Sequence, residues 1–283
     1  MIDFKKLQKP YLIAEIGINH NGDLNVAKKL IDAAHACSWD CVKFQKRNPD
    51  ISVPEHQKNE PKDTPWGKMT YLEYKKKIEF EKKEYDQIAR YCSYKPIDWT
   101  VSVWDLDSLN FIKKYDIPFI KIPSAHLTNH KLLKASAQTG IPIVASTGMS
   151  TLKEVDEAVA VLKKHASQFV LMHCNSSYPS KLEELNLKVI PALKKRYKCP
   201  VGYSGHEYGL DSTSTAVALG ASIVERHITL DRNMWGTDQA SSVEPQGMDK
   251  LYKQIRSVQH YLGDGKKKVY ESELSSRKKL RGK

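Results

Sequence analysis

The amino-acid sequence predicts a single α/β domain, a (β/α)8 TIM barrel. The chain has 283 residues, a length that suits one such barrel. Short apolar strands alternate with helical stretches along its whole length, which is the pattern of βα units around a parallel sheet. Polar or charged side chains also stand at the ends of the strands, where a TIM barrel carries its chemistry.

Eight strands and eight helices are expected in alternation. The strands are expected near residues 11–17, 41–46, 99–103, 119–123, 142–146, 169–174, 201–204 and 222–228. The helices are expected near residues 24–36, 82–94, 106–115, 130–138, 151–164, 186–195, 211–219 and 248–262. This count and order match a closed barrel.

Two segments fall outside this alternation. Residues from about 49 to 77 form an insertion after the second strand, rich in Pro, Lys and Glu and containing Trp66 and Tyr71. A long insertion after a barrel strand often covers the active face as a lid. The barrel is expected over residues 1–262, and the basic, polar tail at 263–283 is expected to be solvated because it lacks a strong apolar stripe.

Composition excludes several other classes of protein. The five cysteines are an odd number without CxxC pairs, which favours reduced thiols in the cytoplasm over a disulfide framework. No apolar run of about 18 residues and no N-terminal signal segment is visible, so no membrane partner is expected. The net charge is +12, but the basic residues are dispersed and lack interleaved aromatic side chains, so no nucleic-acid partner is expected.

The segment AEIGINHNG, Ala14 to Gly22, is the first candidate functional motif. It places Glu15 in an apolar strand, where a carboxylate is costly unless it has a partner or a catalytic role. Gly17 and Gly22 bracket a turn that contains Asn19, His20 and Asn21. A capped βα turn with a satisfied glutamate is the structural alternative.

Seven motifs together resemble the sialic acid (N-acetylneuraminate) synthase family. The others are VKFQK (Val42 to Lys46), FIKIPSA (Phe119 to Ala125), STGMS (Ser146 to Ser150), HCNSSYP (His173 to Pro179), GYSGH (Gly202 to His206) and ERHIT (Glu225 to Thr229). The resemblance covers nearly the whole chain. It implies a transferase that condenses phosphoenolpyruvate with an N-acylated amino sugar, giving a nonulosonic acid and inorganic phosphate.

Two lysines in apolar strands, Lys43 and Lys121, need anionic partners because isolated buried ammonium groups are disfavoured. The partners are either carboxylates of the barrel or a phosphate ester that also meets serine hydroxyls. The resemblance implies a phosphoenolpyruvate site made of Lys43, Ser102, Lys121, Ser124, Ser146, Ser176 and Ser204.

His206 and His227 stand at the ends of the last two strands, which are neighbours in a barrel. Two imidazoles in this arrangement can share a divalent ion and leave coordination positions open. The resemblance implies Mn²⁺, with Mg²⁺ or Co²⁺ as alternatives. A buried histidine that is only hydrogen-bonded is the structural alternative, and His173 fits that description.

The resemblance also assigns catalytic and sugar-binding roles. Glu15 would contact the sugar aldehyde and organise proton transfer, and Gln45, Tyr178 and Asp238 would bind the sugar. His126 occupies a position where many relatives carry glutamate. A histidine can perform acid–base catalysis near neutral pH but is not a permanent anion.

Relatives usually continue into a small domain resembling antifreeze protein, which lends an arginine to the sugar site of a partner subunit. This chain ends before that domain, so the insertion or the basic tail is expected to close the sugar site. The expected partners are phosphoenolpyruvate, the amino sugar and a second copy of the chain in a homodimer. Two alternatives to an amino-sugar synthase remain. One is phosphoenolpyruvate condensation with another aldose, and the other is a non-catalytic barrel that binds sugar phosphates.

Overall fold

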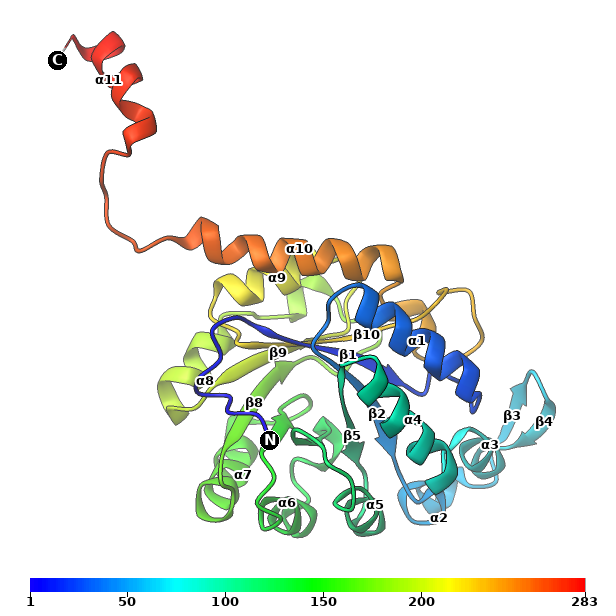
Figure 1. The fold of residues 1–283 in the computed structure, drawn as a ribbon. Coiled ribbons are helices and arrows are strands. Elements are labelled where there is room, and N and C mark those ends of the chain that lie inside the picture. The colour runs from blue at the N-terminus through cyan, green and yellow to red at the C-terminus, as the bar shows by residue number, and fades with distance from the viewer. Residues whose placement is uncertain (283) are drawn as a thin grey trace.

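The structure is a computed structural model that describes residues 1–282. Eight parallel strands form a closed barrel in the order β1-β10-β9-β8-β7-β6-β5-β2 (Figure 1). Their bounds are β1 Tyr11–Gly17, β2 Cys41–Lys46, β5 Asp98–Val103, β6 Ile120–Ile122, β7 Ile143–Ser146, β8 Phe169–Cys174, β9 Val201–Gly205 and β10 Ile223–His227. The predicted (β/α)8 barrel is therefore confirmed, and every predicted strand is present.

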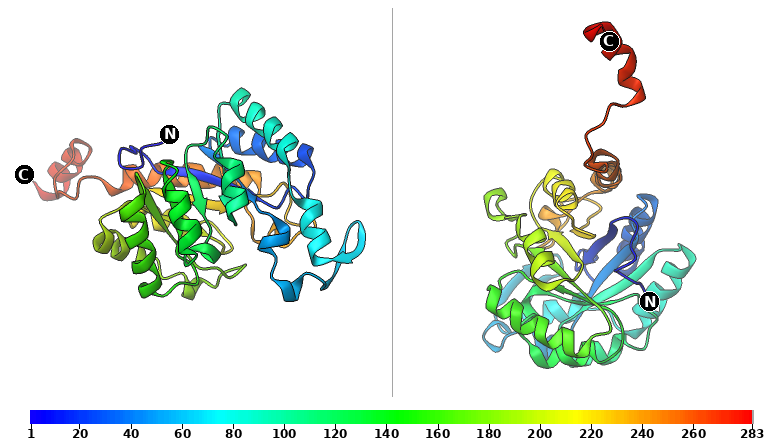
Figure 2. Two further views of the ribbon diagram at one scale, coloured as in Figure 1. Left: turned by 90° about the horizontal axis from the view of Figure 1, so that it is seen from below. Right: turned by 90° about the vertical axis from the view of Figure 1, so that its left-hand side faces the viewer.

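Eight helices surround the barrel, as predicted (Figures 1 and 2). They are α1 Leu24–Ala36, α4 Lys82–Tyr94, α5 Leu106–Ile112, α6 His130–Ala137, α7 Leu152–His165, α8 Val189–Tyr197, α9 Asp211–Ala218 and α10 Pro245–Leu262. The largest boundary errors are at α5, α8 and α10. Helix α10 begins earlier than predicted, at Pro245, because proline suits the first helical position, where no intrahelical N–H is needed.

Helix α7 shows how the local sequence produces these elements. Thr151 and Glu154 form a reciprocal capping box that satisfies free N–H groups of the first turn. One face of the helix is buried against the sheet, through Val155, Ala158, Val159 and Leu162. Basic residues occupy the last turn, where they oppose the negative end of the helix dipole.

The two ends of the barrel interior differ in polarity. Apolar residues fill the N-terminal end, and Phe4 lies across it; they are Tyr11, Ile13, Cys41, Phe119, Val144, Val170, Met172 and Ile223. The buried polar side chains of the strands lie toward the C-terminal end. The filled end provides a packed core on which the polar end is built.

The insertion after β2 has more regular structure than expected. It contains α2 Pro49–Ser52, the antiparallel pair β3 Pro61–Thr64 and β4 Gly67–Thr70, and α3 Tyr71–Ile78. The β3–β4 hairpin projects from the barrel beside α3 (Figure 1). Tyr74 and Ile78 of α3 pack with Ile18 of the β1–α1 turn, and Trp235 from the loop after β10 contacts this cluster.

The tail lies apart from the barrel. Residues 263–282 are exposed and run away from the barrel (Figures 1 and 2), and their one α-helix, α11 Leu274–Arg281, has no buried residue. Within residues 1–282, no helix combines the length and the apolar character needed to cross a membrane. All five cysteines are free in the structure and buried.

Candidate functional site

A cavity of about 190 Å³ opens at the C-terminal ends of the barrel strands. Twelve of its lining residues belong to the predicted site, namely Glu15, Lys43, Gln45, Ser102, Lys121, Ser124, Ser146, Ser176, Tyr178, Ser204, His206 and His227. The barrel register brings them together, since Glu15 pairs with both Lys43 and His227 on neighbouring strands. Residues two apart on one strand point to the same face, so Lys43 and Gln45 both enter the cavity.

Four charged side chains form the floor of this cavity. The Nζ of Lys43 lies 2.6 Å from Glu15 Oε2 and 3.6 Å from Glu225 Oε1, and the Nζ of Lys121 lies 2.8 Å from Glu225 Oε1. All four residues are at most 3 % exposed. The alternative in which barrel carboxylates partner the lysines is therefore realised in this structure.

Glu225 was not among the predicted site residues. Its signal was the alternation in ERHIT, because Glu225 and His227 are two apart on β10 and must share the inner face. Ser204 adds a hydrogen bond from its Oγ to Glu225 Oε1 at 3.3 Å. The prediction considered barrel carboxylates as partners of both lysines but did not name Glu225 as a site residue.

The two glutamates titrate in opposite directions. Burial raises the pKa of Glu225, but Lys121 and Lys43 outweigh burial and bring that pKa down to about 2. Burial also raises the pKa of Glu15, and the single close lysine, Lys43, does not cancel it. Glu15 is therefore the carboxyl group of this pair that takes up a proton at the higher pH.

Serine hydroxyls surround one side of the cavity. The Oγ of Ser146 is buried without a hydrogen-bond partner, and the Oγ of Ser124 accepts a hydrogen bond from the N–H of Gly148 at 3.1 Å. A Cβ atom at Gly148 would collide with the hydroxyls of Ser176 and Ser124, so only glycine leaves this wall open. Free hydroxyls beside buried ammonium groups suit a phosphate or carboxylate ligand.

The two histidines meet the requirements of a metal pair. The Nδ1 of His206 lies 2.5 Å from the carbonyl oxygen of Asn175, to which it must donate, so its Nε2 carries a lone pair. The Nδ1 of His227 is buried without a hydrogen-bond partner. Burial lowers the pKa of His206 to about 4 and also lowers that of His227, so both rings are neutral at neutral pH.

These imidazoles are close to each other, with ring centroids 5.5 Å apart, and Asp238 Oδ2 lies 3.7 Å from His227 Nδ1. Across residues 1–282, no group of three or more His, Cys, Asp or Glu side chains is arranged to hold a metal ion. The residues present fit a divalent ion that keeps open positions for substrate or water.

The predicted sugar-binding residues lie beside this pair. The Oη of Tyr178 is 3.0 Å from the Nε2 of His206, and the amide of Gln45 donates to Glu15 Oε1 at 3.1 Å. Asp238 does not line the cavity but adjoins it through His227. His173 bonds through Nε2 to the carbonyl oxygen of Leu185 at 2.7 Å, which fits a structural role.

His126 does not reach the cavity. Its ring packs edge-to-face on Trp104 with centroids 5.3 Å apart, and Trp104 is the residue that lines the cavity. Burial lowers the pKa of His126. The structure therefore gives no geometric support to the predicted catalytic role of His126. Trp104, which was not among the predicted site residues, lines the cavity instead of His126.

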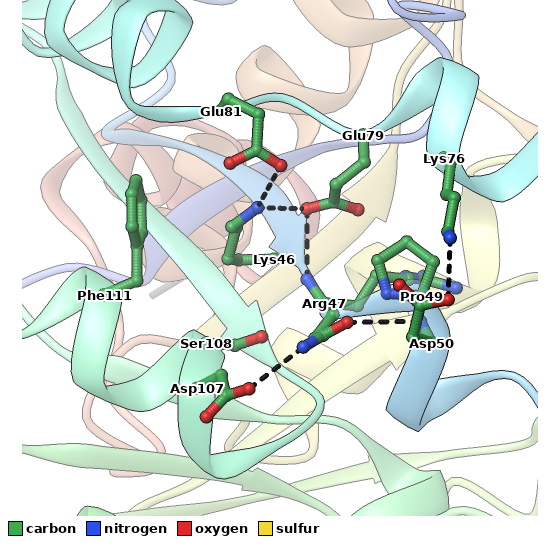
Figure 3. Close-up of a pocket in the computed structure, with 11 residues that line it drawn as sticks. Lys46, Arg47, Pro49, Asp50, Lys76, Glu79, Glu81, Asp107, Ser108 and Phe111 are labelled. Atoms are coloured by element: carbon green, nitrogen blue, oxygen red, sulfur yellow. Dashed lines mark hydrogen bonds and ion pairs between the residues drawn. The ribbon is translucent and has the colours of Figure 1, made fainter.

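A second cavity, of about 400 Å³, lies on the outer side of β2 (Figure 3). Its lysines are partnered, Lys46 with Glu79 and Glu81, and Lys76 with Asp50. Asp107 accepts from the amide of Asn48. Arg47 also lines this cavity, and its Nε is buried without a hydrogen-bond partner.

The amino-acid sequence matches the NeuB family over residues 30–267. It is 38% identical to the N,N'-diacetyllegionaminic acid synthase of Campylobacter jejuni, and the match covers 94% of this chain and 81% of that protein. It is 37% identical to the human N-acetylneuraminate-9-phosphate synthase, with coverage of 95% and 76%.

A solved structure gives the same result. The N-acetylneuraminic acid (sialic acid) synthetase of Leptospira borgpetersenii, in complex with citrate, superposes with a TM-score of 0.86 at 34% identity. The match covers 98% of this chain and 94% of that one. The fold, the strand-end cavity and these similarities agree: the chain belongs to the NeuB family.

Proposed function

We propose that the protein condenses phosphoenolpyruvate with the aldehyde of an N-acylated amino sugar, forming a nonulosonic acid and inorganic phosphate. The main structural support is a pair of buried ammonium groups, Lys43 and Lys121, in the same cavity as the unpartnered hydroxyl of Ser146. The names of the relatives, which are synthases of sialic, legionaminic and pseudaminic acids, support this reaction class.

Phosphoenolpyruvate would bind at the charged floor of the cavity. Lys43 and Lys121 would contact its anionic groups, and Ser102, Ser124, Ser146, Ser176 and Ser204 would donate hydrogen bonds to them. The two glutamates already balance the two lysines, so an incoming anion favours protonation of Glu15, whose pKa burial has raised. Glu225 would remain ionised and hold both lysines in place.

The reaction forms one carbon–carbon bond and breaks one carbon–oxygen bond. The methylene carbon of phosphoenolpyruvate attacks the aldehyde carbon, water adds to the resulting cationic carbon, and the tetrahedral intermediate expels phosphate. A proton from Glu15 would neutralise the aldehyde oxygen as it becomes a hydroxyl group. Gln45 holds the Glu15 carboxyl group through a hydrogen bond and would orient it.

We also propose that His206 and His227 hold a divalent metal ion, with Mn²⁺ as the first choice. When bound, the ion would supply Lewis-acid polarisation of the sugar aldehyde. The hydrogen bond to Asn175 fixes the ring of His206 so that Nε2 is the ligating atom. Tyr178 and Asp238, which adjoin these rings, would bind hydroxyl or acylamino groups of the sugar.

The test is release of inorganic phosphate from phosphoenolpyruvate by the purified protein, with Mn²⁺ and a panel of aldoses. We expect release that requires an N-acylated amino sugar, stops with a chelator and returns with added Mn²⁺. Phosphate release only with a simple aldose would favour phosphoenolpyruvate condensation with another aldose. No phosphate release with any sugar would contradict the proposal. Direct titration of Mn²⁺ should show one site in the native protein and none in His227→Ala.

A further inference from the structure

A buried ion pair stands directly beside the two histidines of the proposed metal site. Glu207 follows His206 just past the end of β9, and Arg226 precedes His227 on β10. The Nη1 of Arg226 lies 3.1 Å from Glu207 Oε1, and both side chains are at most 1 % exposed. Arg226 is flanked by Glu225 and His227, which line the cavity, so it faces the outer side of the barrel.

Arg226 binds the backbone after His206 as well as the carboxylate. Its Nη2 donates to the carbonyl oxygen of Glu207 at 2.7 Å, and its Nη1 donates to the carbonyl oxygen of Gly209 at 3.1 Å. Nη1 also donates to Thr213 Oγ1 of α9 at 2.7 Å. The planar guanidinium therefore ties β10 to the segment that follows His206 at several points, with fixed directions.

The carboxylate of Glu207 is held from its other side. The Oη of Tyr203 on β9 donates to Glu207 Oε2 at 2.9 Å, and the hydroxyl of Ser212 donates to Oε1. A Cβ atom at Gly205 would lie 2.8 Å from both carboxylate oxygens, so glycine is required at this position. Gly205 is also the residue that pairs with Arg226 between β9 and β10. Glu207 is thus fixed relative to both strands.

Stability alone does not account for this pair. Burying two charges costs desolvation, and apolar side chains of similar volume are often as stable or more stable in such positions. The Nε of Arg226 is also buried without a hydrogen-bond partner. What the pair provides is a fixed spacing between β10 and the segment after β9, the two backbones that carry the imidazole rings.

Building on the proposed function, we propose that Arg226 and Glu207 are positioning residues, which set the separation of the two imidazole rings for a divalent ion. The ring centroids of His206 and His227 lie 5.5 Å apart. Metal–imidazole bonds are about 2 Å long, with a tolerance of about 0.2 Å, so the spacing of the two backbones governs the affinity. Arg226 and Glu207 lie outside the cavity and act only through the backbone.

The test is titration of Mn²⁺ into the metal-free, full-length protein, with free Mn²⁺ followed by electron paramagnetic resonance. The main variant combines Arg226→Met with Glu207→Gln, which removes both charges and leaves no unpaired buried ion. We expect its Kd for Mn²⁺ to be roughly 10-fold higher or more, the usual effect of losing an outer-shell partner. Arg226→Lys keeps the charge but loses the planar fork, so it should also weaken Mn²⁺ binding.

Two controls separate positioning from general damage. Arg256→Met removes a guanidinium that also meets a carboxylate and a backbone carbonyl, those of Asp40 and Pro10, at the other end of the barrel, and it should bind Mn²⁺ like the native protein. Binding of phosphoenolpyruvate to the metal-free protein, followed by tryptophan fluorescence, should change by less than about 3-fold in every variant, because its proposed contacts are separate from the ion pair.

The possible results are distinct. If the native protein binds no Mn²⁺, the proposed metal site is wrong and this inference falls with it. If the native protein binds Mn²⁺ and both Arg226 variants bind it equally well, this inference is overturned and the metal site stands. Equal losses of Mn²⁺ and phosphoenolpyruvate binding would show that the ion pair only stabilises the fold, which also overturns the inference.

Discussion

At the scale of single residues, the site depends on oppositely charged side chains that are paired and buried at the floor of the cavity. Glu225 contacts both lysines, so it sets the positions of the two ammonium groups before any substrate arrives. Glu15 contacts only one of the two lysines, Lys43, and burial keeps its pKa raised. Glu225 and the two lysines thus form a preorganised anion-binding site. Glu15 is the group in this cluster that can exchange a proton.

Replacing Lys121 should separate binding of the two substrates. Lys121→Met keeps most of the side-chain volume but removes a cation from the floor of the cavity. We expect the KM for phosphoenolpyruvate to rise by roughly 30-fold or more, and the KM for the sugar to change by less than about 3-fold. Steady-state kinetics at varied concentrations of each substrate measures both, with exposed Lys134→Met as the control. Equal losses for both substrates would show that Lys121 does not bind phosphoenolpyruvate.

Lys75 gives a prediction about stability. Burial lowers the pKa of Lys75 from 10.5 to about 7 in the folded protein. The unfolded chain therefore binds more protons between these values, so this group makes the free energy of unfolding rise with pH by up to about 1.4 kcal/mol per unit. Below pH 7 the folded protein carries the full penalty of the buried charge.

The variant Lys75→Met should remove that penalty. We expect it to be more stable than the native protein at pH 7, by roughly 3–5 kcal/mol at most, with the advantage shrinking as the pH approaches 10. Urea unfolding at several pH values measures the difference. A variant that is less stable than the native protein at pH 7 would show that Lys75 has a stabilising partner in solution.

At the scale of elements, the barrel register assembles the site. The strands β1, β2 and β10 carry Glu15, Lys43 and His227 at paired positions, so correct strand pairing by itself places these groups together. The sequence allowed this much to be predicted because strand ends in a parallel barrel share one rim. It did not reveal how far each side chain reaches, which is why the edge-to-face packing of His126 on Trp104 was missed.

The insertion shows a different limit of sequence reasoning. Its hairpin is short and largely exposed, so no alternating apolar pattern marks β3 or β4. Helix α3 did carry a signal, since Thr70 and Glu73 form a capping box. Its orientation depends on contacts with Ile18 and Trp235, which are far away in the sequence.

The hairpin supports a prediction about the insertion as a lid. Trp66, near its tip, packs edge-to-face on Trp235 with centroids 5.9 Å apart. Replacing residues 63–68 by two glycines removes this contact but keeps Thr70 and the start of α3. We expect a higher sugar KM or a lower turnover, with an unchanged KM for phosphoenolpyruvate, because that site is built on the strands. Unchanged sugar kinetics would remove the lid hypothesis.

At the scale of the whole molecule, polarity divides the barrel interior into two halves. The N-terminal half is filled by apolar side chains around Phe119, and the C-terminal half holds the charges and hydroxyls of the site. This division is typical of TIM barrels, in which stability and chemistry occupy opposite ends. The homodimer and the cytoplasmic location stay predictions; sedimentation of the purified protein tests the first.

The central claim is a condensation that breaks the carbon–oxygen bond of phosphoenolpyruvate. The most direct measurement uses phosphoenolpyruvate with a heavy-oxygen label at the bridging position, an N-acylated amino sugar and Mn²⁺, with mass analysis of both products. We predict that the label appears in inorganic phosphate and that an acid three carbons longer than the acceptor sugar forms in equal amount. Label retained in the organic product, or phosphate released without sugar consumption, would contradict the account.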